Sequence, residues 1–306
     1  MSESVLYRME DINYNNFSDG IIFIFSLSDE DRATRVFDQL LKENVKILEL
    51  IIIKYNNSVE LPGNVKSHID ESKIKSILIN NSSIDFVNFL KSLSFDNKQN
   101  AIVIDISCIH VLEMFTLLKF LKVEGICGLD IVYSVPFDYN FTSEPFTSYK
   151  SYSGDLKMVE PIGFSGSTNS KNVELYMFIG FEGPLALKVH EDCEYSELKL
   201  INSLPSFFPK YKDIAIINNY KLMQYPHTSL YVPADNPFET YNLLESSVNK
   251  DNNICIAPLS TKPIALGICL FALYNESVRV VYPTSEKYNA NTTHSIYKSC
   301  LYHIDF

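Results

Sequence analysis

Two segments of the chain repeat one pattern of hydrophobic and polar positions. Residues 254–289 read as a short apolar strand, a polar turn, an apolar helix, a second strand and another polar turn, and residues 101–140 show the same order. Elsewhere, continuous apolar runs such as residues 21–25 (IIFIF) and 47–53 (ILELIII) are typical of strands that are buried on both faces. These runs alternate with helical spacing, which predicts mainly parallel sheets with helices on both faces.

This order of elements predicts an α/β protein made of two tandem Rossmann-like units. The length of 306 residues accommodates one large domain or two smaller ones. We assign residues 1–140 to a first half, 141–172 to a connecting segment rich in Ser, Thr, Tyr and Gly, and 173–306 to a second half. Residues 296–306 are apolar and form a candidate edge strand of the second half.

Residue-by-residue matches favour an internal duplication. At an offset of 154 positions Phe25 falls on Ile179, and at an offset of 153 positions Ser107 falls on Ser260. Any two Rossmann-like units look alike when they are overlaid, but a near-constant offset across several elements favours a true repeat. Ligands of open parallel sheets bind outside the carboxyl ends of the strands, so a duplicated sheet predicts two such crevices.

The charge of the chain limits its partners. The net charge is −11, with 14 basic against 21 acidic residues in 1–150 and 12 against 16 in 151–306. Neither part is basic and no run is rich in Lys or Arg, which argues against a large nucleic-acid interface. A small anionic ligand is still compatible with this composition, because a local field can oppose the net charge.

Cysteine usage and the N-terminus predict a cytoplasmic protein. The six cysteines lie mostly in apolar segments and form no C-x-x-C pair, which is typical of reduced core residues. The first residues lack the pattern of a signal peptide, and no apolar run reaches the roughly 18 residues of a membrane span. The six histidines show no metal-ligand spacing, and neither a Walker A motif nor G-x-G-x-x-G is present, so we expect no metal and no cofactor.

The turn Ser260-Thr261-Lys262 is the best candidate for binding chemistry. The residue before a proline avoids the α region, so the helix is expected to begin at Pro263. Free backbone N–H groups, two hydroxyls and a cation together would suit a phosphate or a carboxylate. The simpler alternative is a solvated lysine beside an ordinary helix cap.

A second candidate is the turn Gly180-Phe181-Glu182-Gly183, which follows a predicted strand. Glycine lets the chain bend there, so a ligand could approach the backbone N–H groups closely, although a plain tight turn has the same sequence. The counterpart in the first half, residues 29–32, is mostly acidic, as a helix N-terminus favours. Only Arg32 is a candidate ligand contact in that stretch.

Carboxylates at strand ends give further candidates. Asp105 follows an apolar run ahead of Ser107, and a carboxylate there needs a partner. It could hold a ribose hydroxyl, act as a base or tie down the neighbouring turn. Asp235 could likewise contact a sugar. If the protein is an enzyme, Asp105 or Glu182 is the candidate acid or base.

Aromatic residues complete the candidate set. Tyr282 and Tyr288 belong to the last predicted strand-end turn, and Tyr133 and Tyr139 are their counterparts in the first half. Aromatic walls near an anion site suit a stacked base, whereas packing is the ordinary role of tyrosine in a chain with 19 of them.

Tandem halves, polar turns at every strand end, Ser107, residues 260–263 and residues 282–289 together resemble the CARF fold and its fused tandem relative, SAVED. These are sensor domains of prokaryotic defence systems that bind cyclic or linear oligonucleotides across the seam between their halves. The resemblance covers most of the chain in topology, with few motifs. It implies a sensor of nucleotide-like ligands in antiviral defence. No effector is fused here, so the effector would be a separate protein.

Three functions from different classes remain open. The first is a non-catalytic protein that binds a nucleotide or oligonucleotide through Ser260, Thr261, Lys262 and the turn at 180–183. The second is a hydrolase or transferase that acts on a nucleotide or nucleoside. The third is a structural subunit of a defence complex with no small ligand.

Overall fold

The chain folds as two compact units. Unit 1 comprises Met1–Asn140 and Ala290–Phe306, and unit 2 comprises Phe141–Asn289. The computed structural model describes residues 4–6, 13–56, 59, 68–79, 83–93, 95, 101–139, 152–166, 172–249, 252–288 and 293–306. Residues 290–306 belong to unit 1, so the predicted second half of 173–306 is too long at its end.

Unit 1 is built on a mainly parallel sheet. Its strand order is β1-β14-β6-β5-β2-β3-β4 among the described residues, and the run from β6 to β4 is parallel throughout. The outer strands β14 and β1 are antiparallel to their neighbours. The strands are β1 (Ser4–Leu6), β2 (Ile21–Leu27), β3 (Ile47–Lys54), β4 (Ile74–Leu78), β5 (Ala101–Asp105), β6 (Gly128–Tyr139) and β14 (Thr293–Asp305).

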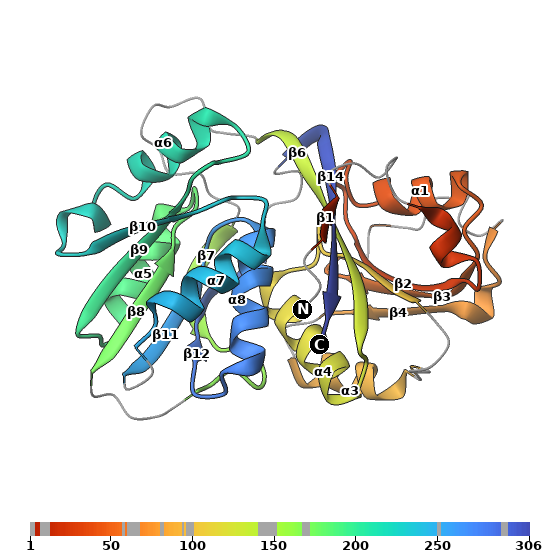
Figure 1. The fold of residues 1–306 in the computed structure, drawn as a ribbon, viewed down its shortest axis with the longest axis horizontal. Coiled ribbons are helices and arrows are strands. Elements are labelled where there is room, and N and C mark those ends of the chain that lie inside the picture. The colour runs from red at the N-terminus through yellow and green to blue at the C-terminus, as the bar shows by residue number, and fades with distance from the viewer. Residues whose placement is uncertain are drawn as a thin grey trace. The chain divides into compact units, whose positions relative to one another are not determined.

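The end of the chain returns to unit 1 because β14 pairs with β6. The pairing runs from Thr293 opposite Tyr139 to Asp305 opposite Gly128, and the two long strands lie side by side in Figure 1. β1 covers the other side of β14, so β14 is not the edge strand expected from residues 296–306. Unit 2 is therefore inserted between two neighbouring strands of unit 1.

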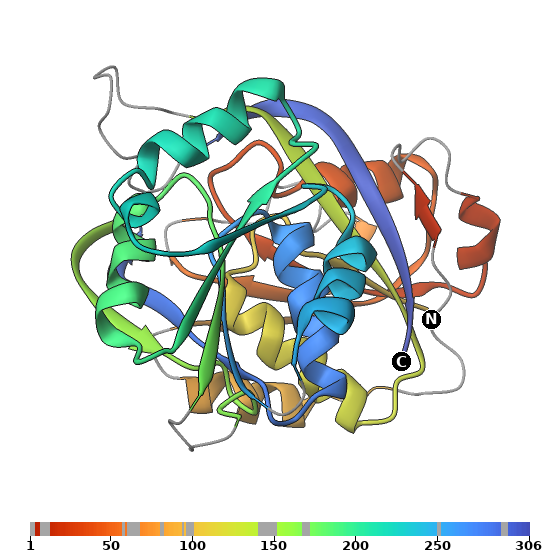
Figure 2. The same cartoon turned by 60° about the vertical axis from the view of Figure 1, so that its left-hand side comes forward.

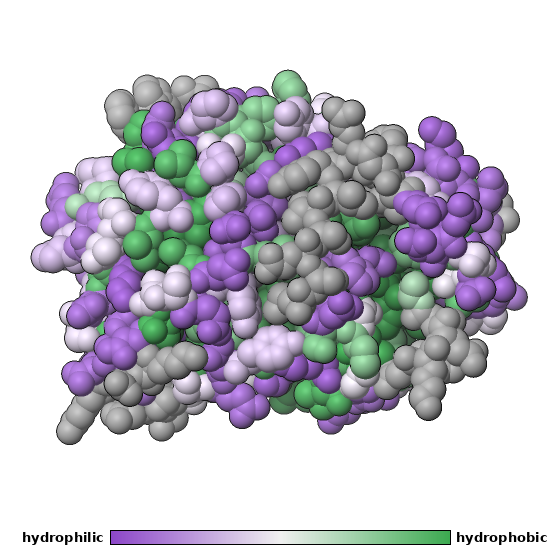
Figure 3. Space-filling model, in the orientation of Figure 1, coloured by the Kyte–Doolittle hydropathy of each residue, from purple (hydrophilic) through white to green (hydrophobic). Residues whose placement is uncertain are grey.

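Three helices of unit 1 cover its sheet in the described residues: α1 (Arg35–Lys42), α3 (Ser83–Ser92) and α4 (Val111–Val123). α1 is amphipathic. Its Phe37 ring stacks on Phe23 and Phe25 of β2, at centroid distances of 6.1 and 6.0 Å. Asp38 and Lys42 face solvent, and Figure 3 shows hydrophilic residues over this helix. A continuous apolar strand and one apolar helix stripe therefore account for this side of the core.

Unit 2 contains a second parallel sheet, with the strand order β10-β9-β8-β11-β12. A separate antiparallel ribbon joins β7 to β13, so the predicted connecting segment 141–172 contributes a strand to unit 2. The strands are β7 (Tyr152–Val159), β8 (Val173–Phe178), β9 (Glu197–Ser203), β10 (Thr228–Val232), β11 (Asn253–Pro258), β12 (Arg279–Val280) and β13 (Tyr282–Tyr288).

The helices of unit 2 lie on opposite faces of its sheet. They are α5 (Gly183–Asp192), α6 (Pro209–Asn218), α7 (Pro237–Ser247) and α8 (Lys262–Tyr274). Leu175 and Met177 of β8 pack with α5, whereas the alternate residue Tyr176 donates a hydrogen bond to Ser247 of α7. Figure 2 shows α7 alongside α8. A Cβ on Gly267 would lie 2.2 Å from the carbonyl oxygen of Pro237, so glycine permits this close approach.

Both units have the same strand order. Numbered along the chain within each unit, the parallel strands run 3-2-1-4-5, as β4-β3-β2-β5-β6 in unit 1 and β10-β9-β8-β11-β12 in unit 2. This is the doubly wound order of Rossmann-like folds, which confirms the predicted fold class. The helix after each fourth strand, α4 or α8, has 13 residues. An internal duplication would produce such a match.

Candidate functional site

The carboxyl edge of each sheet holds most of the predicted site residues. In a doubly wound sheet the first and fourth strands feed helices on opposite faces, and the crevice for a ligand opens between them. Those strands are β2 and β5 in unit 1 and β8 and β11 in unit 2. The two edges carry different residues.

In unit 2 the loop after β8 is held by backbone packing. A Cβ on Gly180 would lie 2.2 Å from the carbonyl oxygen of Leu259, and one on Gly183 would lie 1.9 Å from that of Asn218. Asn219 Nδ2 donates to the carbonyl oxygen of Gly180 at 2.8 Å. Close approach inside the unit therefore requires both glycines, while the contact of residues 180–183 with a ligand stays a prediction.

The turn after β11 brings hydroxyls from several strand ends together. The hydroxyls of Ser260 and Ser203, the last residue of β9, share a hydrogen bond of 3.2 Å. Thr261 is the N-cap of α8, but its Oγ1 donates to the carbonyl oxygen of Ala234 at 2.7 Å and makes no capping hydrogen bond to the helix. α8 begins at Lys262, one residue before the predicted start at Pro263. The sequence had not indicated Ser203.

The first turn of α8 differs in charge from that of α4. It contains Lys262 and no acidic residue, whereas α4 has Glu113 in its first turn. The N-terminus of a helix carries a partial positive charge that an acidic side chain offsets. In α8 the dipole and Lys262 have the same sign, so the start of this helix is electropositive and favours an anion.

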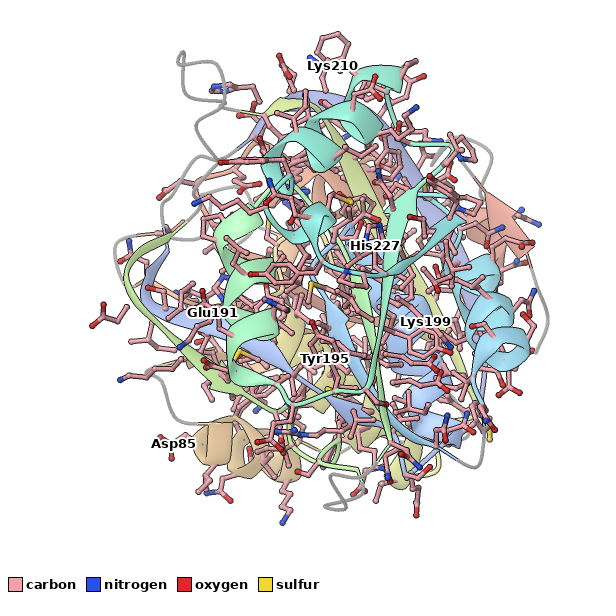
Figure 4. All side chains as sticks on the ribbon, turned by 90° about the vertical axis from the view of Figure 1, so that its left-hand side faces the viewer. Asp85, Glu191, Tyr195, Lys199, Lys210 and His227 are labelled. Atoms are coloured by element: carbon pink, nitrogen blue, oxygen red, sulfur yellow. The ribbon has the colours of Figure 1, made fainter. Side chains whose placement is uncertain are left out.

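Two aromatic residues at the start of α6, Phe208 and Tyr211, lie beside the loop after β8. They were not predicted from the sequence. Phe181 makes an edge contact with Tyr211 at 5.1 Å between ring centroids, and Phe208 makes another at 5.2 Å. Lys210 Nζ lies 5.4 Å from the centroid of the Tyr211 ring. Figure 4 shows Lys210 on α6 and Lys199 at a lower level on β9. A sequence signal was present in the run of residues 207–211, FFPKY, which precedes and opens a helix.

In unit 1 the loop after β2 is filled by an ion pair. Arg32 Nε donates to Glu30 Oε2 at 2.6 Å, with only 11% and 14% of the two side chains exposed. The guanidinium also donates to the Tyr133 hydroxyl at 3.5 Å. Burial alone would lower the pKa of Arg32, but Tyr133, Cys108 and Glu30 raise it well above its ordinary value. Arg32 is thus a stably charged internal partner.

Three neighbours of Arg32, two tyrosines and a cysteine, have raised pKa values. Burial raises the pKa of Tyr133 well above its ordinary value, and it also raises the pKa of Tyr139. Burial raises the pKa of the Cys108 thiol to about 11, although Arg32 opposes this shift. The predicted aromatic residues Tyr133 and Tyr139 therefore both lie near Arg32, whose Cζ is 5.9 Å from the centroid of the Tyr133 ring.

The acidic residues of the same loop anchor the returning strand. Thr293 Oγ1 donates to Glu30 Oε2 at 2.7 Å, and the backbone N–H of Ser295 donates to Asp31 Oδ2 at 3.0 Å. Thr293 is the first residue of β14. Glu30 and Asp31 thus bind the start of β14 to the loop after β2. This loop is where a Rossmann-like unit ordinarily binds its ligand.

Asp105 and Ser107 tie down the turn after β5. Asp105 is 2% exposed, and its Oδ1 accepts a hydrogen bond of 2.9 Å from the backbone N–H of Ser107. Ser107 is 1% exposed, and its Oγ accepts from the N–H of Ser134 at 2.7 Å. Of the three roles considered for Asp105, this geometry favours the local turn.

A second cluster of unit 1 joins the end of β3 to the start of α4. The Tyr55 ring stacks on His110, the N-cap of α4, at 3.6 Å between centroids. The Tyr55 hydroxyl accepts from the His110 N–H at 2.9 Å and donates to Glu113 Oε2 at 3.2 Å. Burial, and then Glu113, raise the pKa of Tyr55 well above its ordinary value. The hydroxyl therefore satisfies the start of α4 from inside the unit.

The last predicted turn is a strand. Tyr282 and Tyr288 are the first and last residues of β13 and pair with Val159 and Tyr152 of β7. The expectation of a strand-end turn is wrong here, because β12 contains only Arg279–Val280 and the chain then enters the ribbon. Asn140 and Asn289 lie outside the described residues. Asp235 precedes the Asn236 cap of α7, which accepts from the N–H of Phe238 at 3.0 Å.

Neither a candidate metal site nor a candidate membrane span occurs among the described residues. No group of three or more His, Cys, Asp or Glu side chains is placed to hold a metal ion in the part of the chain that the structure describes. Across the same residues, no helix is long and apolar enough to cross a membrane.

Comparisons with known proteins give little further information. No protein-family model matches the chain, and no curated protein matches it. A solved structure titled CobK precorrin-6A reductase is similar over 85% of this chain and 86% of its own, with 11% sequence identity and a TM-score of 0.24. A similarity at this level carries no argument about function. The resemblance to CARF and SAVED stays a prediction.

Proposed function

We propose that this protein binds a small nucleotide-like anion, without turning it over, at the carboxyl edge of the unit 2 sheet. The observation that carries the proposal is the start of α8. It lies at the switch point of a Rossmann-like sheet, it has no acidic residue in its first turn, and it combines Lys262 with the hydroxyls of Ser260 and Ser203. A cation and two hydroxyls would add to the helix dipole and free N–H groups that favour phosphate at a helix N-terminus.

The uncapped start of α8 supports the same assignment. Pro263 has no N–H group, so most of the donors to an anion would come from Lys262 and the hydroxyls rather than from the backbone. Thr261 directs its proton to Ala234, which leaves the helix N-terminus without a side-chain cap from that residue. An anion at this position would complete the end of the helix.

Neighbouring residues suit the remaining parts of a nucleotide. Asp235, in the turn between β10 and α7, carries a carboxylate that can accept hydrogen bonds from sugar hydroxyls. Phe181, Phe208 and Tyr211 form an aromatic cluster beside the loop after β8, and aromatic faces stack on nucleobases at about 1–3 kcal/mol per base. A nucleotide therefore matches the edge of unit 2 better than inorganic phosphate does.

The geometry favours binding over catalysis. Asp105, the leading candidate for an acid or base, is buried and its Oδ1 is committed to the turn at Ser107. Glu182 is the N-cap residue of α5 and makes no side-chain capping bond there. A protein that binds a ligand without turning it over requires an effector to act on the signal, and we propose a separate chain for that role, as in antiviral sensing.

Isothermal titration calorimetry with mononucleotides, cyclic dinucleotides and linear oligonucleotides tests the proposal. Loss of a charged hydrogen-bond donor costs about 1.5–3 kcal/mol, so Lys262→Ala should weaken the Kd of the bound nucleotide by about 10- to 100-fold. Lys188→Ala is the matched control, because Lys188 is a lysine of the same unit whose partner is Asp192 on the surface of α5. Its Kd should equal that of the wild type.

Two results would contradict the proposal. One is the absence of binding by the wild type across the panel, and the other is unchanged binding by Lys262→Ala. Chromatography of each nucleotide after incubation separates binding from turnover, because a processing enzyme at this edge of unit 2 would consume its ligand and lose that activity in Glu182→Gln. Co-purification of a partner protein without any nucleotide affinity would favour the structural subunit.

A further inference from the structure

Two cysteines from different elements of unit 2 meet beneath α5. Cys193 follows the last residue of α5 as its C-cap, and Cys255 lies in β11. Cys193 packs on the apolar cluster that contains Cys255, and the two thiols share a hydrogen bond. Both are free thiols, and 61 residues lie between them in the sequence. Two thiols within hydrogen-bond reach can pair as a disulfide where their Cα atoms lie about 4.4–6.8 Å apart.

Solvent reaches one thiol of the pair and not the other. Cys255 is 2% exposed, whereas Cys193 is partly exposed at the surface. Glu191 and Tyr195, which flank Cys193 in the sequence, lie at the end of α5 in Figure 4. A small reagent can therefore react first at Cys193 and leave Cys255 as an internal second thiol.

Arg279 places a positive charge next to the pair. It lies opposite Cys255 in the register of β11 and β12, and its Nε donates to Glu160 Oε1 at 2.6 Å. The hydrogen bond from Cys255 lowers the pKa of Cys193 against the effect of burial, and Arg279 lowers it further, while Asp192 and Glu160 oppose this. The same hydrogen bond and burial raise the pKa of Cys255. Cys193 is thus the better thiolate and Cys255 the proton donor.

We propose that Cys193 and Cys255 form a reversible disulfide when the protein meets a peroxide. The Cys193 thiolate attacks one peroxide oxygen, an S–O bond forms as the O–O bond breaks, and the other oxygen leaves as water or an alcohol after taking up a proton. The Cys255 sulfur then displaces the hydroxyl of the Cys193 sulfenic acid, which leaves as water with the Cys255 proton. Two thiols lose two electrons in total, and the peroxide gains them.

This inference is independent of the proposed ligand. It assigns a chemical role to two residues that the nucleotide site does not use. The disulfide would join the end of α5 to the middle of the sheet, and a dithiol would reverse it by thiol–disulfide exchange.

Thiol counting and peptide mapping test the proposal. The reduced full-length protein is treated with hydrogen peroxide, denatured, and alkylated before digestion under non-reducing conditions. Two of the six thiols should be lost, and one linked peptide should join Cys193 to Cys255. Dithiothreitol should restore six. In Cys255→Ser, which keeps the attacking thiol and removes the resolving one, dimedone should label Cys193 as a sulfenic acid.

Cys127→Ser is the matched control, because Cys127 is an exposed thiol of unit 1. This variant should still form the linked peptide and should lose two of its remaining thiols. The proposal is overturned if wild-type Cys193 proceeds to sulfinic acid without any linked peptide, if Cys127 reacts before Cys193, or if the disulfide joins other cysteines. Circular dichroism of each variant before oxidation verifies that it is folded. Peptide mapping of the oxidised wild type decides the proposal even if a variant does not fold.

Discussion

The two units share one strand order and differ in what occupies the switch point. In unit 1 the loop after β2 holds the Glu30–Arg32 pair, and its acids bind the first residues of β14. In unit 2 the equivalent loop packs its backbone against Leu259 and Asn218, and the helix after the fourth strand begins with Lys262. The same strand order is thus closed by its own side chains in unit 1 and left electropositive in unit 2. Function in such folds lies in the loops rather than in the sheet.

The largest expected effect comes from breaking the ion pair of unit 1. Arg32→Met keeps most of the side-chain volume but leaves Glu30 without its charged partner in a mostly buried site. Removing one member of a buried pair costs about 3–5 kcal/mol, so the free energy of unfolding should fall by about that amount. Chemical denaturation followed by circular dichroism measures it.

The double variant Arg32→Met with Glu30→Gln sharpens this test. It removes both charges, so it should be more stable than Arg32→Met alone. If Arg32→Met changes the unfolding free energy by less than about 1 kcal/mol, as an exposed ion pair would, the loop of unit 1 is not closed in the way described.

A smaller loss is expected from crowding the loop of unit 2. In Gly183→Ala the new Cβ would lie 1.9 Å from the Asn218 carbonyl oxygen, which is backbone and cannot move aside easily. Overpacking of this kind costs about 1–3 kcal/mol in unfolding free energy. Gly128→Ala is the control, because its nearest heavy atom is Asp305 Oδ1 at 3.4 Å. Equal stabilities of the two variants would show that the loop is loosely packed.

The smallest effect is the pH dependence of β14, a strand with no counterpart among the described residues of unit 2. His303 Nδ1 lies 2.9 Å from Asp130 Oδ1, and its Nε2 lies 3.3 Å from Asp305 Oδ1. The hydrogen bond with Asp130 raises the pKa of His303 above its ordinary value, against the effect of burial. The stabilisation is therefore full below the unfolded pKa of about 6.5 and is lost as pH rises through the raised folded pKa.

The pH-dependent stabilisation by His303 is small because 43% of its side chain is exposed. Solvent screening therefore reduces this stabilisation to about 0.5 kcal/mol or less. Denaturation at pH 5.5 and pH 8.5, values chosen about one to two units either side of the ordinary histidine pKa, measures the difference. His303→Gln should reduce the loss of stability between them, and His227→Gln on unit 2 should not. A larger loss in His303→Gln than in the wild type would reverse the assigned sign.

The sequence predicts most of the fold and part of the site. Apolar runs such as IIFIF in β2 identify buried parallel strands because only a strand covered on both faces is apolar at every position. The pairing of β14 with β6 could not be predicted, because hydrophobic alternation gives no partner for a strand across an inserted unit. Residues 282–288 were expected as a turn from their polar composition, yet pairing with β7 makes them a strand.

Side-chain partners explain the remaining differences at the site. Arg32 and Tyr133 are 101 positions apart, and their contact depends on the sheet order. Ser203 was not predicted, because nothing in its local sequence distinguishes it from other serines before the fold places it beside Ser260. The sequence correctly placed Ser260, Thr261 and Lys262 after a strand. A short polar segment between an apolar strand and an apolar helix forms the turn that joins them.

The insertion of unit 2 has a consequence for synthesis and assembly. During translation a ribosome releases about 5–20 residues per second, and domains fold as they emerge. β1 pairs with β14 in the described residues, so the first strand to leave the ribosome takes its place only after the last one arrives. Unit 2, whose strands are contiguous, can complete its sheet earlier. Until then the exposed side of β6 is an open edge, and a nascent chain stalled before Thr293 would present that edge to other strands.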